Sequence, residues 1–314
     1  MEKLRIVFMG TPEFAVGILD AIRKAGYEIV GVITAPDKPA GRGQKLKYSA
    51  VKEYALQNNL TILQPTNLKD SAFLEQLKAL NANIQVVVAF RMLPEVVWNM
   101  PKFGTFNLHA SLLPQYRGAA PINWAIINGE QKTGVTTFFI DNKIDTGAII
   151  LSKSIVIEPN ENAGDLHDKL MLLGCKATVE TLQKIEDNTI TTSIQPENTD
   201  LKTAYKLNKD NCKIDFSKSG SEINNLIRGL SPYPAAWCFI KDTEEWNVKI
   251  YESNFEEVSH HFQTGKLITS KKTLSIAVQN GLLHIKSLQL PGKKRMQTAE
   301  LLNGIQFSEN ALAY

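Results

Sequence analysis

The sequence predicts an α/β protein in two parts: a mostly parallel sheet with helices on both faces, then a smaller β-barrel. In the first half, short and wholly apolar runs, of which 84–89 is the clearest, alternate with amphipathic segments. Strands that are apolar on both faces are typical of parallel sheets covered by helices. Residues 206–314 instead contain several short strand-like runs in succession, and this pattern is typical of small barrels.

The order of elements in the first half supports the sheet. The expected strands lie at residues 4–9, 29–33, 62–63, 84–89, 105–109, 136–140 and 148–157. The expected helices lie at 12–25, 49–58, 70–80, 119–128 and 162–185. Their ends carry familiar signals, because Pro12 stands in the first turn of one helix, Gly26 follows its end, and Ser49 can cap the next. Strands that alternate with helices predict parallel βαβ connections.

A polar segment divides the chain. Residues 187–205 lack helical periodicity and are the best candidate for a linker between a domain of residues 1–186 and a domain of residues 206–314. The second domain opens with an amphipathic helix at 219–229. Five expected strands follow, at 236–240, 247–252, 266–269, 274–278 and 282–288. We expect a small barrel, for which the oligonucleotide-binding type is one option.

Composition describes an ordinary globular protein. Of 314 residues, 43% are hydrophobic and 21% charged, which provides material for a sizeable core. The net charge of +3 comes from residues 206–314, which hold 14 basic and 11 acidic residues. The three cysteines, Cys175, Cys212 and Cys238, are too far apart for a metal cluster and too few for a disulfide framework. With neither a signal peptide nor a membrane-spanning run in the sequence, we expect a cytoplasmic protein.

The start of the chain argues against a dinucleotide cofactor. The fingerprint G-x-G-x-x-G is absent after the first strand, where Gly10 is followed by Thr11 and Pro12. Gly10 is better explained as the residue that permits a tight turn from strand to helix.

Two polar residues mark the end of one expected strand. Asn107 and His109 lie two residues apart, so they share one face, and Leu108 lies on the other. Ligands of open α/β sheets bind at the carboxyl ends of the strands. An amide and an imidazole side by side suit a reaction in which a carbonyl oxygen gains negative charge. A lone strand histidine is usually structural, but Asn107, the turn Ser111–Pro114 and Asp145 together favour a catalytic site.

Two basic segments have two possible explanations. Residues 36–47 combine flexible glycines with Lys38, Arg42, Lys45 and Lys47, and a second run contains Lys293 and Lys294. Such loops are commonly solvated surface. They can also contact phosphates, because each neutralised phosphate contributes to binding through counterion release. The residues alone do not separate these two interpretations.

The chain resembles the folate-dependent formyltransferases. The segments that carry the resemblance are NLHASLLPQYRGAAPINWAIINGE (107–130), TGVTTFFIDNKIDTGAII (133–150), GTPEFA (10–15), PAGRGQKL (39–46) and PGKKRM (291–296). The resemblance runs from about residue 4 to beyond residue 300. Asn-x-His with SLLP and a later Asp-Thr-Gly is specific to the superfamily. The loop 39–46 and the second domain resemble the members that act on charged initiator tRNA.

The resemblance implies a Rossmann-like formyltransferase sheet, and a reaction. The formyl group of 10-formyltetrahydrofolate would pass to the α-amino group of methionine on initiator methionyl-tRNA, without a metal, in a monomeric protein. The implied catalytic residues are Asn107, His109 and Asp145. The implied folate-binding residues are Ser111, Leu112, Leu113, Pro114, Phe90 and Met92. The implied tRNA-binding residues are Arg42, Lys45, Lys47, Lys293 and Lys294.

The three implied catalytic residues would have distinct roles. Asp145 would accept or relay the proton of the amine, and Asn107 with the His109 ring would stabilise the oxyanion. His109 could instead protonate the leaving folate nitrogen. Many family members have Tyr-Gly where this chain has Phe90-Arg91-Met92, so we expect a different folate pocket.

Other acceptors remain possible at this point. A sugar-nucleotide formyltransferase uses the same folate donor and also has two domains, but it lacks the basic loop. A ribonucleotide formyltransferase is a single domain and has no use for residues 206–314. A non-enzymatic tRNA-binding protein would leave Asn107, His109 and Asp145 unexplained.

Overall fold

The structure of the chain is a computed structural model that describes residues 2–40, 45–196 and 200–314. The chain forms two compact units. The first comprises residues 1–118, 133–155 and 167–203, and the second comprises 119–132, 156–166 and 204–314. Two segments from the middle of the chain therefore cluster with the C-terminal residues.

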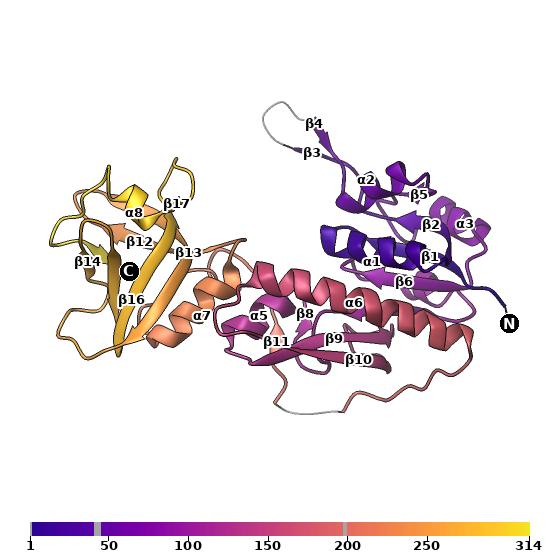
Figure 1. Cartoon of the computed structure of the whole chain (residues 1–314). Coiled ribbons are helices and arrows are strands. Elements are labelled where there is room, and N and C mark those ends of the chain that lie inside the picture. Colours follow the sequence, from indigo (N-terminus) through magenta and orange to yellow (C-terminus); the bar gives the residue numbers. More distant parts are fainter. Residues whose placement is uncertain (1, 41–44, 197–199) are drawn as a thin grey trace. The chain divides into compact units, whose positions relative to one another are not determined.

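The first unit is built on a seven-stranded sheet (Figure 1). In spatial order its strands are β10 (Ile149–Val156), β9 (Lys132–Phe139), β7 (Thr105–His109), β6 (Ile84–Val88), β1 (Arg5–Gly10), β2 (Glu28–Ile33) and β5 (Ile62–Leu63). The five strands from β7 to β5 are parallel, whereas β9 runs antiparallel to β7. The predicted parallel sheet is confirmed, with an antiparallel extension at one edge.

Helices cover both faces of this sheet. The helices of the first unit are α1 (Glu13–Lys24), α2 (Ala50–Gln57), α3 (Ser71–Ala79), α4 (Glu95–Trp98) and α6 (Ala163–Glu186), the last of which begins in the second unit. On one face, sheet residues such as Val7 and Val87 share an apolar cluster with Phe73 of α3 and Val97 of α4. On the other face, Gly174 of α6 lies against the side chain of Leu108.

Local sequence explains where the helices begin and end. The Ser49 hydroxyl accepts a hydrogen bond from Lys52 N at 3.0 Å, and Asp70 accepts one from Phe73 N at 3.1 Å, so both residues cap helices as N-caps do. Gly26 follows α1 with φ of +86°, a conformation that glycine adopts without strain. These helix boundaries agree closely with the sequence prediction.

The basic segment of residues 36–47, which the sequence suggested to be a loop, contains two short strands. β3 (Lys38–Ala40) pairs antiparallel with β4 (Lys45–Lys47), so that Lys38 is opposite Lys47. The pair projects from the rest of the first unit (Figure 1). Arg42 lies outside the described residues.

The second unit is a nearly closed antiparallel barrel with helices. Its strands are β12 (Ala236–Lys241), β13 (Glu245–Glu257), β14 (Leu267–Thr269), β15 (Leu274–Val278), β16 (Gly281–Gln289), β17 (Met296–Gln297) and β18 (Leu312–Ala313). The sheet order is β14-β15-β16-β13-β12-β18, and a bridge between Lys266 and Leu312 links its two ends. The predicted barrel is confirmed.

Helices α5 (Pro121–Ile127), α7 (Gly220–Leu230) and α8 (Thr298–Leu301) belong to the second unit. Ser219 and Glu222 form a capping box at the start of α7. The Asn123 side chain of α5 donates to Gly229 O of α7 at 2.8 Å, which joins the two helices. Two short strands, β8 (Arg117–Gly118) and β11 (Thr203–Ala204), complete the elements. Among the described residues, none of the helices has the length and apolar character needed to cross a bilayer.

Candidate active site

The predicted catalytic residues meet at the carboxyl end of β7. Asn107 and His109 project from the face opposite Leu108, as the alternation of the strand requires. β7 lies between parallel β6 and antiparallel β9, where Asn107 is opposite Phe138 and His109 is opposite Thr136. Asp145 enters from the turn between β9 and β10, and its Oδ2 lies 3.8 Å from His109 Nδ1.

The ring of His109 is oriented by a backbone carbonyl. Its Nε2 lies 2.8 Å from Tyr116 O, and only 7% of the side chain is exposed. A carbonyl oxygen can only accept, so Nε2 carries a proton. Nδ1 is therefore the nitrogen that faces Asp145, at a separation too long for a direct hydrogen bond. Any proton exchanged by this ring with substrate or with Asp145 passes through Nδ1.

The Asp145 carboxylate is hydrogen-bonded to the backbone just after the Ser111–Pro114 turn. Its Oδ2 accepts a hydrogen bond from Gly118 N at 2.9 Å, and its side chain is 14% exposed. The residue has φ of +55°, in the left-handed region that non-glycine residues seldom adopt. A buried side chain that the sequence did not single out, Gln195, donates to the backbone oxygens of Asp145 and Gly147.

The side chain of Asn107 differs from those of His109 and Asp145 in its hydrogen bonding. It is half-buried, and within the described part of the chain its amide has no hydrogen-bond partner. A half-buried amide without a protein partner can satisfy its hydrogen-bonding groups through water or a ligand. Its placement beside His109 therefore suits the binding of a polar substrate atom.

Hydrogen bonds within the turn after β7, and from this turn to β9, hold it in place. The Ser111 hydroxyl donates to Gln115 O at 2.7 Å, and Ser111 O accepts from the Thr136 hydroxyl at the same distance. Ser111 is fully buried and Leu113 is 7% exposed, whereas Leu112 and Pro114 are half-buried. Within the predicted folate-binding set of this turn, Leu112 and Pro114 are thus the side chains that a ligand can reach.

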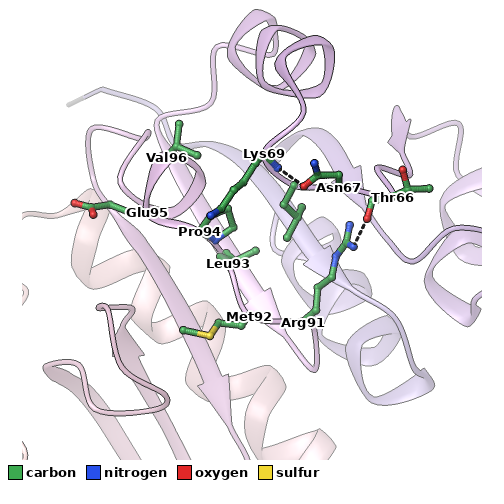
Figure 2. Close-up of a pocket in the computed structure, with 10 residues that line it drawn as sticks. Thr66, Asn67, Lys69, Arg91, Met92, Leu93, Pro94, Glu95 and Val96 are labelled. Atoms are coloured by element: carbon green, nitrogen blue, oxygen red, sulfur yellow. Dashed lines mark hydrogen bonds between the residues drawn. The ribbon is translucent and has the colours of Figure 1, made fainter.

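A cavity of about 1040 Å³ lies beside the segment that follows β6 (Figure 2). The lining residues come from two stretches of the first unit, 66–69 and 91–96. Met92 is 66% exposed there, and Phe90 is half-buried against the apolar cluster of α3 and α4. The Arg91 guanidinium points away from Met92 and donates to Pro65 O and to Thr66 O, the latter at 2.8 Å. Arg91 thus ties this segment to the loop after β5.

The predicted cationic residues belong partly to the first unit and partly to the second. Lys47 of β4 is exposed in the first unit, and Lys293 and Lys294 are exposed in the turn after β16 of the second. Lys45 belongs to β4, and Arg42 lies outside the described residues. Among the residues described, no group of three or more His, Cys, Asp or Glu side chains is arranged to hold a metal ion.

Two family models match the two halves of the chain. A family model described as formyl transferase matches residues 4–182, and one described as formyl transferase, C-terminal domain, matches residues 206–306. The chain belongs to the formyl transferase family, which confirms the resemblance found in the sequence.

Two similar relatives have the same name. A protein named methionyl-tRNA formyltransferase from Flavobacterium johnsoniae is 72% identical over 100% of both chains. One of the same name from Bacteroides thetaiotaomicron is 52% identical over 98% of both chains.

Solved structures share the fold at lower identity. The sugar 3N-formyl transferase WlaRD, crystallised with dTDP and 5-N-formyl-THF, superposes with a TM-score of 0.65 at 25% identity, covering 94% of this chain and 100% of that chain. HypX from Aquifex aeolicus in complex with tetrahydrofolic acid gives a TM-score of 0.66 at 14% identity, covering 98% of this chain and 49% of that one.

Proposed function

We propose that the protein transfers the formyl group of 10-formyltetrahydrofolate to the α-amino group of methionine on initiator methionyl-tRNA. The observation that carries this proposal is the meeting of Asn107, His109 and Asp145 at one strand end, in a chain 72% identical to a methionyl-tRNA formyltransferase. Because the product serves translation initiation, we propose that the protein acts in the cytoplasm. We further propose that it acts as a monomer.

The chemistry begins with the acceptor amine. It must be neutral to attack the formyl carbon, and the Asp145 carboxylate, 3.8 Å from His109 Nδ1, can take or relay its proton. Attack forms the new carbon–nitrogen bond and places negative charge on the former carbonyl oxygen. The Asn107 amide can donate a hydrogen bond to that oxygen, which stabilises the charge as it develops.

The orientation of His109 narrows its role. Since Nε2 is occupied by Tyr116 O, the ring reaches the reacting atoms through Nδ1. In this proposal, the proton that leaves the acceptor amine is relayed by Asp145 to Nδ1, and Nδ1 delivers it to the folate nitrogen when the carbon–nitrogen bond to that nitrogen breaks. The same hydrogen bond to Tyr116 keeps the ring fixed through both steps.

The folate donor is proposed to lie against the segments that follow β6 and β7, two neighbouring strands. Met92 in the first segment and Leu112 and Pro114 in the second each have exposed area. The cavity beside Met92 gives room for a ligand of this size, since pockets for small molecules are commonly 300–1000 Å³.

The cationic segments are proposed to bind the phosphates of the tRNA. Lys45 and Lys47 belong to the projecting β3–β4 pair, Arg42 lies between its two strands in the sequence, and Lys293 and Lys294 belong to the barrel. We propose that residues 1–186 form the catalytic domain, 187–205 a linker and 206–314 a tRNA-binding domain.

The main alternative is an amino-sugar nucleotide as acceptor, because WlaRD, named a sugar 3N-formyl transferase, shares the fold. Its identity of 25%, against 72% for the methionyl-tRNA relative, favours the tRNA. The test compares formyl transfer from 10-formyltetrahydrofolate to charged initiator tRNA, an amino-sugar nucleotide and a ribonucleotide amine. Uncharged tRNA is the control. We expect kcat/KM to be highest for the charged tRNA, and a preference for either small acceptor would reject the proposal.

A further inference from the structure

Gln195 connects the two chain segments that hold Asp145. The side chain is 5% exposed, although it comes from the polar segment predicted to be a linker. Its Nε2 donates to Asp145 O and to Gly147 O, each at 2.9 Å. Its Oε1 accepts from Arg117 Nε at 3.1 Å and from Arg117 Nη2 at 2.6 Å. These four hydrogen bonds use the full donor and acceptor capacity of the amide.

The Asp145 turn needs such support. With φ of +55°, Asp145 adopts a conformation that persists only where its surroundings hold it. The Gln195 amide fixes the carbonyl oxygens on both sides of Thr146, and so fixes the direction in which the Asp145 side chain leaves the backbone.

The same amide also acts on the other partner of the carboxylate. Arg117, which Gln195 binds through two nitrogens, directly precedes Gly118, whose N donates to Asp145 Oδ2 at 2.9 Å. Gln195 therefore contacts both the backbone of Asp145 and the residue next to the donor of its carboxylate.

The position of Gln195 is itself fixed by the sheet. Two residues earlier, Ser193 pairs antiparallel with Ile149 at the start of β10, through backbone bonds of 2.8 and 2.9 Å. The main chain that carries Gln195 is thus attached to the strand that follows the Asp145 turn. A buried, fully bonded amide on an anchored segment is suited to hold a neighbour in one place.

We propose that Gln195 is a positioning residue for formyl transfer, which sets the orientation of the Asp145 carboxylate relative to His109. This inference rests on the proposed function. Gln195 itself lies against backbone and Arg117 and contacts no substrate in this account.

The substitution Gln195→Glu distinguishes the accepting role of Gln195 Oε1 from the donating role of Nε2. A carboxylate at this position still accepts hydrogen bonds from Arg117, but it cannot donate to Asp145 O and Gly147 O, and it repels them. We expect kcat with charged initiator tRNA to fall about 10- to 100-fold, because small displacements of a catalytic group have effects of this size. KM values should stay within about a factor of two, since binding of neither substrate uses this amide.

The matched control makes the same amide-to-acid change where it should have no effect. Gln183 is exposed on α6 of the same unit, so Gln183→Glu should retain the kcat of the unaltered protein. Thermal unfolding of both variants separates a loss of folded protein from a loss of turnover. If Gln195→Ala does not fold, Gln195→Glu, which keeps the volume of the side chain, supports the same comparison.

A double-mutant cycle distinguishes positioning from general structural support. If Gln195 acts through Asp145, then Gln195→Glu should lower kcat by no more than about two-fold in the Asp145→Asn background. Losses that multiply in the double variant would overturn the inference, as would Gln195→Glu and Gln195→Ala variants with unaltered kcat. Either result leaves the proposed function intact, provided that the unaltered protein formylates charged initiator tRNA in the same assay. An unaltered protein that does not formylate charged initiator tRNA would overturn both.

Discussion

The catalytic edge of the first unit and the C-terminal barrel differ in the polar groups that they bury. At the strand edge of the first unit, an imidazole, a carboxylate and an amide, from His109, Asp145 and Gln195, are each at most 14% exposed. In residues 204–314, which the structure describes in full, the buried polar side chains are hydroxyls, from Ser231, Ser275, Ser287 and Thr298. Buried imidazole and amide groups therefore occur at the strand edge, whereas the buried oxygen- or nitrogen-containing side chains of residues 204–314 are hydroxyls.

The barrel interior is correspondingly apolar. Burial raises the pKa of the Cys238 thiol to about 12, so this group remains neutral at physiological pH. Lysines such as Lys293 and Lys294 lie on its surface. We infer that the first unit supplies the chemistry and that the barrel contributes affinity for a polyanion.

The largest expected effect is on Asn107. Asn107→Ala should lower kcat by about 10²–10³, the usual loss when one oxyanion donor is removed. The affinity for folate should change little, because the donor matters most after charge has developed. Steady-state kinetics and folate titration measure both. Asn303→Ala, the same change at an exposed position of the barrel, should leave kcat unaltered. Turnover within a few-fold of the unaltered protein would show that Asn107 is not the oxyanion donor.

Asp145 should have the next largest effect. Asp145→Asn retains the size of the side chain and can keep the hydrogen bond from Gly118 N, but it removes the proton acceptor. We expect kcat to fall by about 10² or more. The pH dependence of kcat is the informative measurement. If raising the pH restores the activity of this variant, the carboxylate orients a neighbouring group and takes no proton.

The cationic residues should affect binding and leave turnover unchanged. Neutralising Arg42, Lys45 and Lys47 together should raise the KM for charged tRNA without changing folate binding, since phosphate contacts position a nucleic acid. The logarithmic salt dependence of tRNA binding should become shallower by about 1 for each phosphate that is no longer bound. Arg42 should contribute most, because its planar group can grip a phosphate or stack on a base.

The barrel lysines can be tested against a control on the same domain. Lys293→Gln with Lys294→Gln should weaken tRNA binding, whereas the same changes at Lys271 and Lys272, on another exposed turn, should not. Equal effects of the two pairs would mean that the barrel attracts tRNA through net charge alone. Unaltered kinetics of the triple variant at Arg42, Lys45 and Lys47 would show that these residues belong to ordinary solvated surface.

Arg91 should have the smallest effect. Arg91→Gly removes two hydrogen bonds to Pro65 O and Thr66 O on an exposed surface, and we expect a loss of stability of about 1 kcal/mol. The apparent affinity for folate should shift modestly and kcat should remain. Arg91→Lys, which keeps the charge, should lie between the two proteins in thermal unfolding. Complete loss of folding would make Arg91 a structural residue of the first unit.

The sequence could predict the fold class and the shared face of Asn107 and His109, because both depend on local patterns. The place of Asp145 beside them was expected from the resemblance to the formyltransferases, since it lies far along the chain from His109. Asn107 and His109 share a face through the alternation of one strand, and helix caps such as Ser49 act on their own helix. The short helices α4 and α8 were not predicted, since four residues give too little periodicity. β3 and β4 were also missed because their lysines, and the glycines between them in the sequence, are typical of loops.

The support of Asp145 could not be predicted for a different reason. Gln195 and Arg117 are 78 residues apart, and their contact exists only once the sheet has brought β10 beside residue 193. A glutamine in a polar segment gives no signal of burial. Likewise, only the structure shows that Met92 is exposed at a cavity while Arg91 binds the neighbouring loop.

The division of roles is tested most directly by one set of kinetics on charged initiator tRNA. The unaltered protein, Asn107→Ala and the triple variant at Arg42, Lys45 and Lys47 are compared at fixed saturating 10-formyltetrahydrofolate. We expect Asn107→Ala to lose kcat with an unchanged KM for tRNA, and the triple variant to keep kcat with a raised KM for tRNA. A triple variant that loses kcat, or an Asn107→Ala variant that loses mainly KM, would contradict this division of roles.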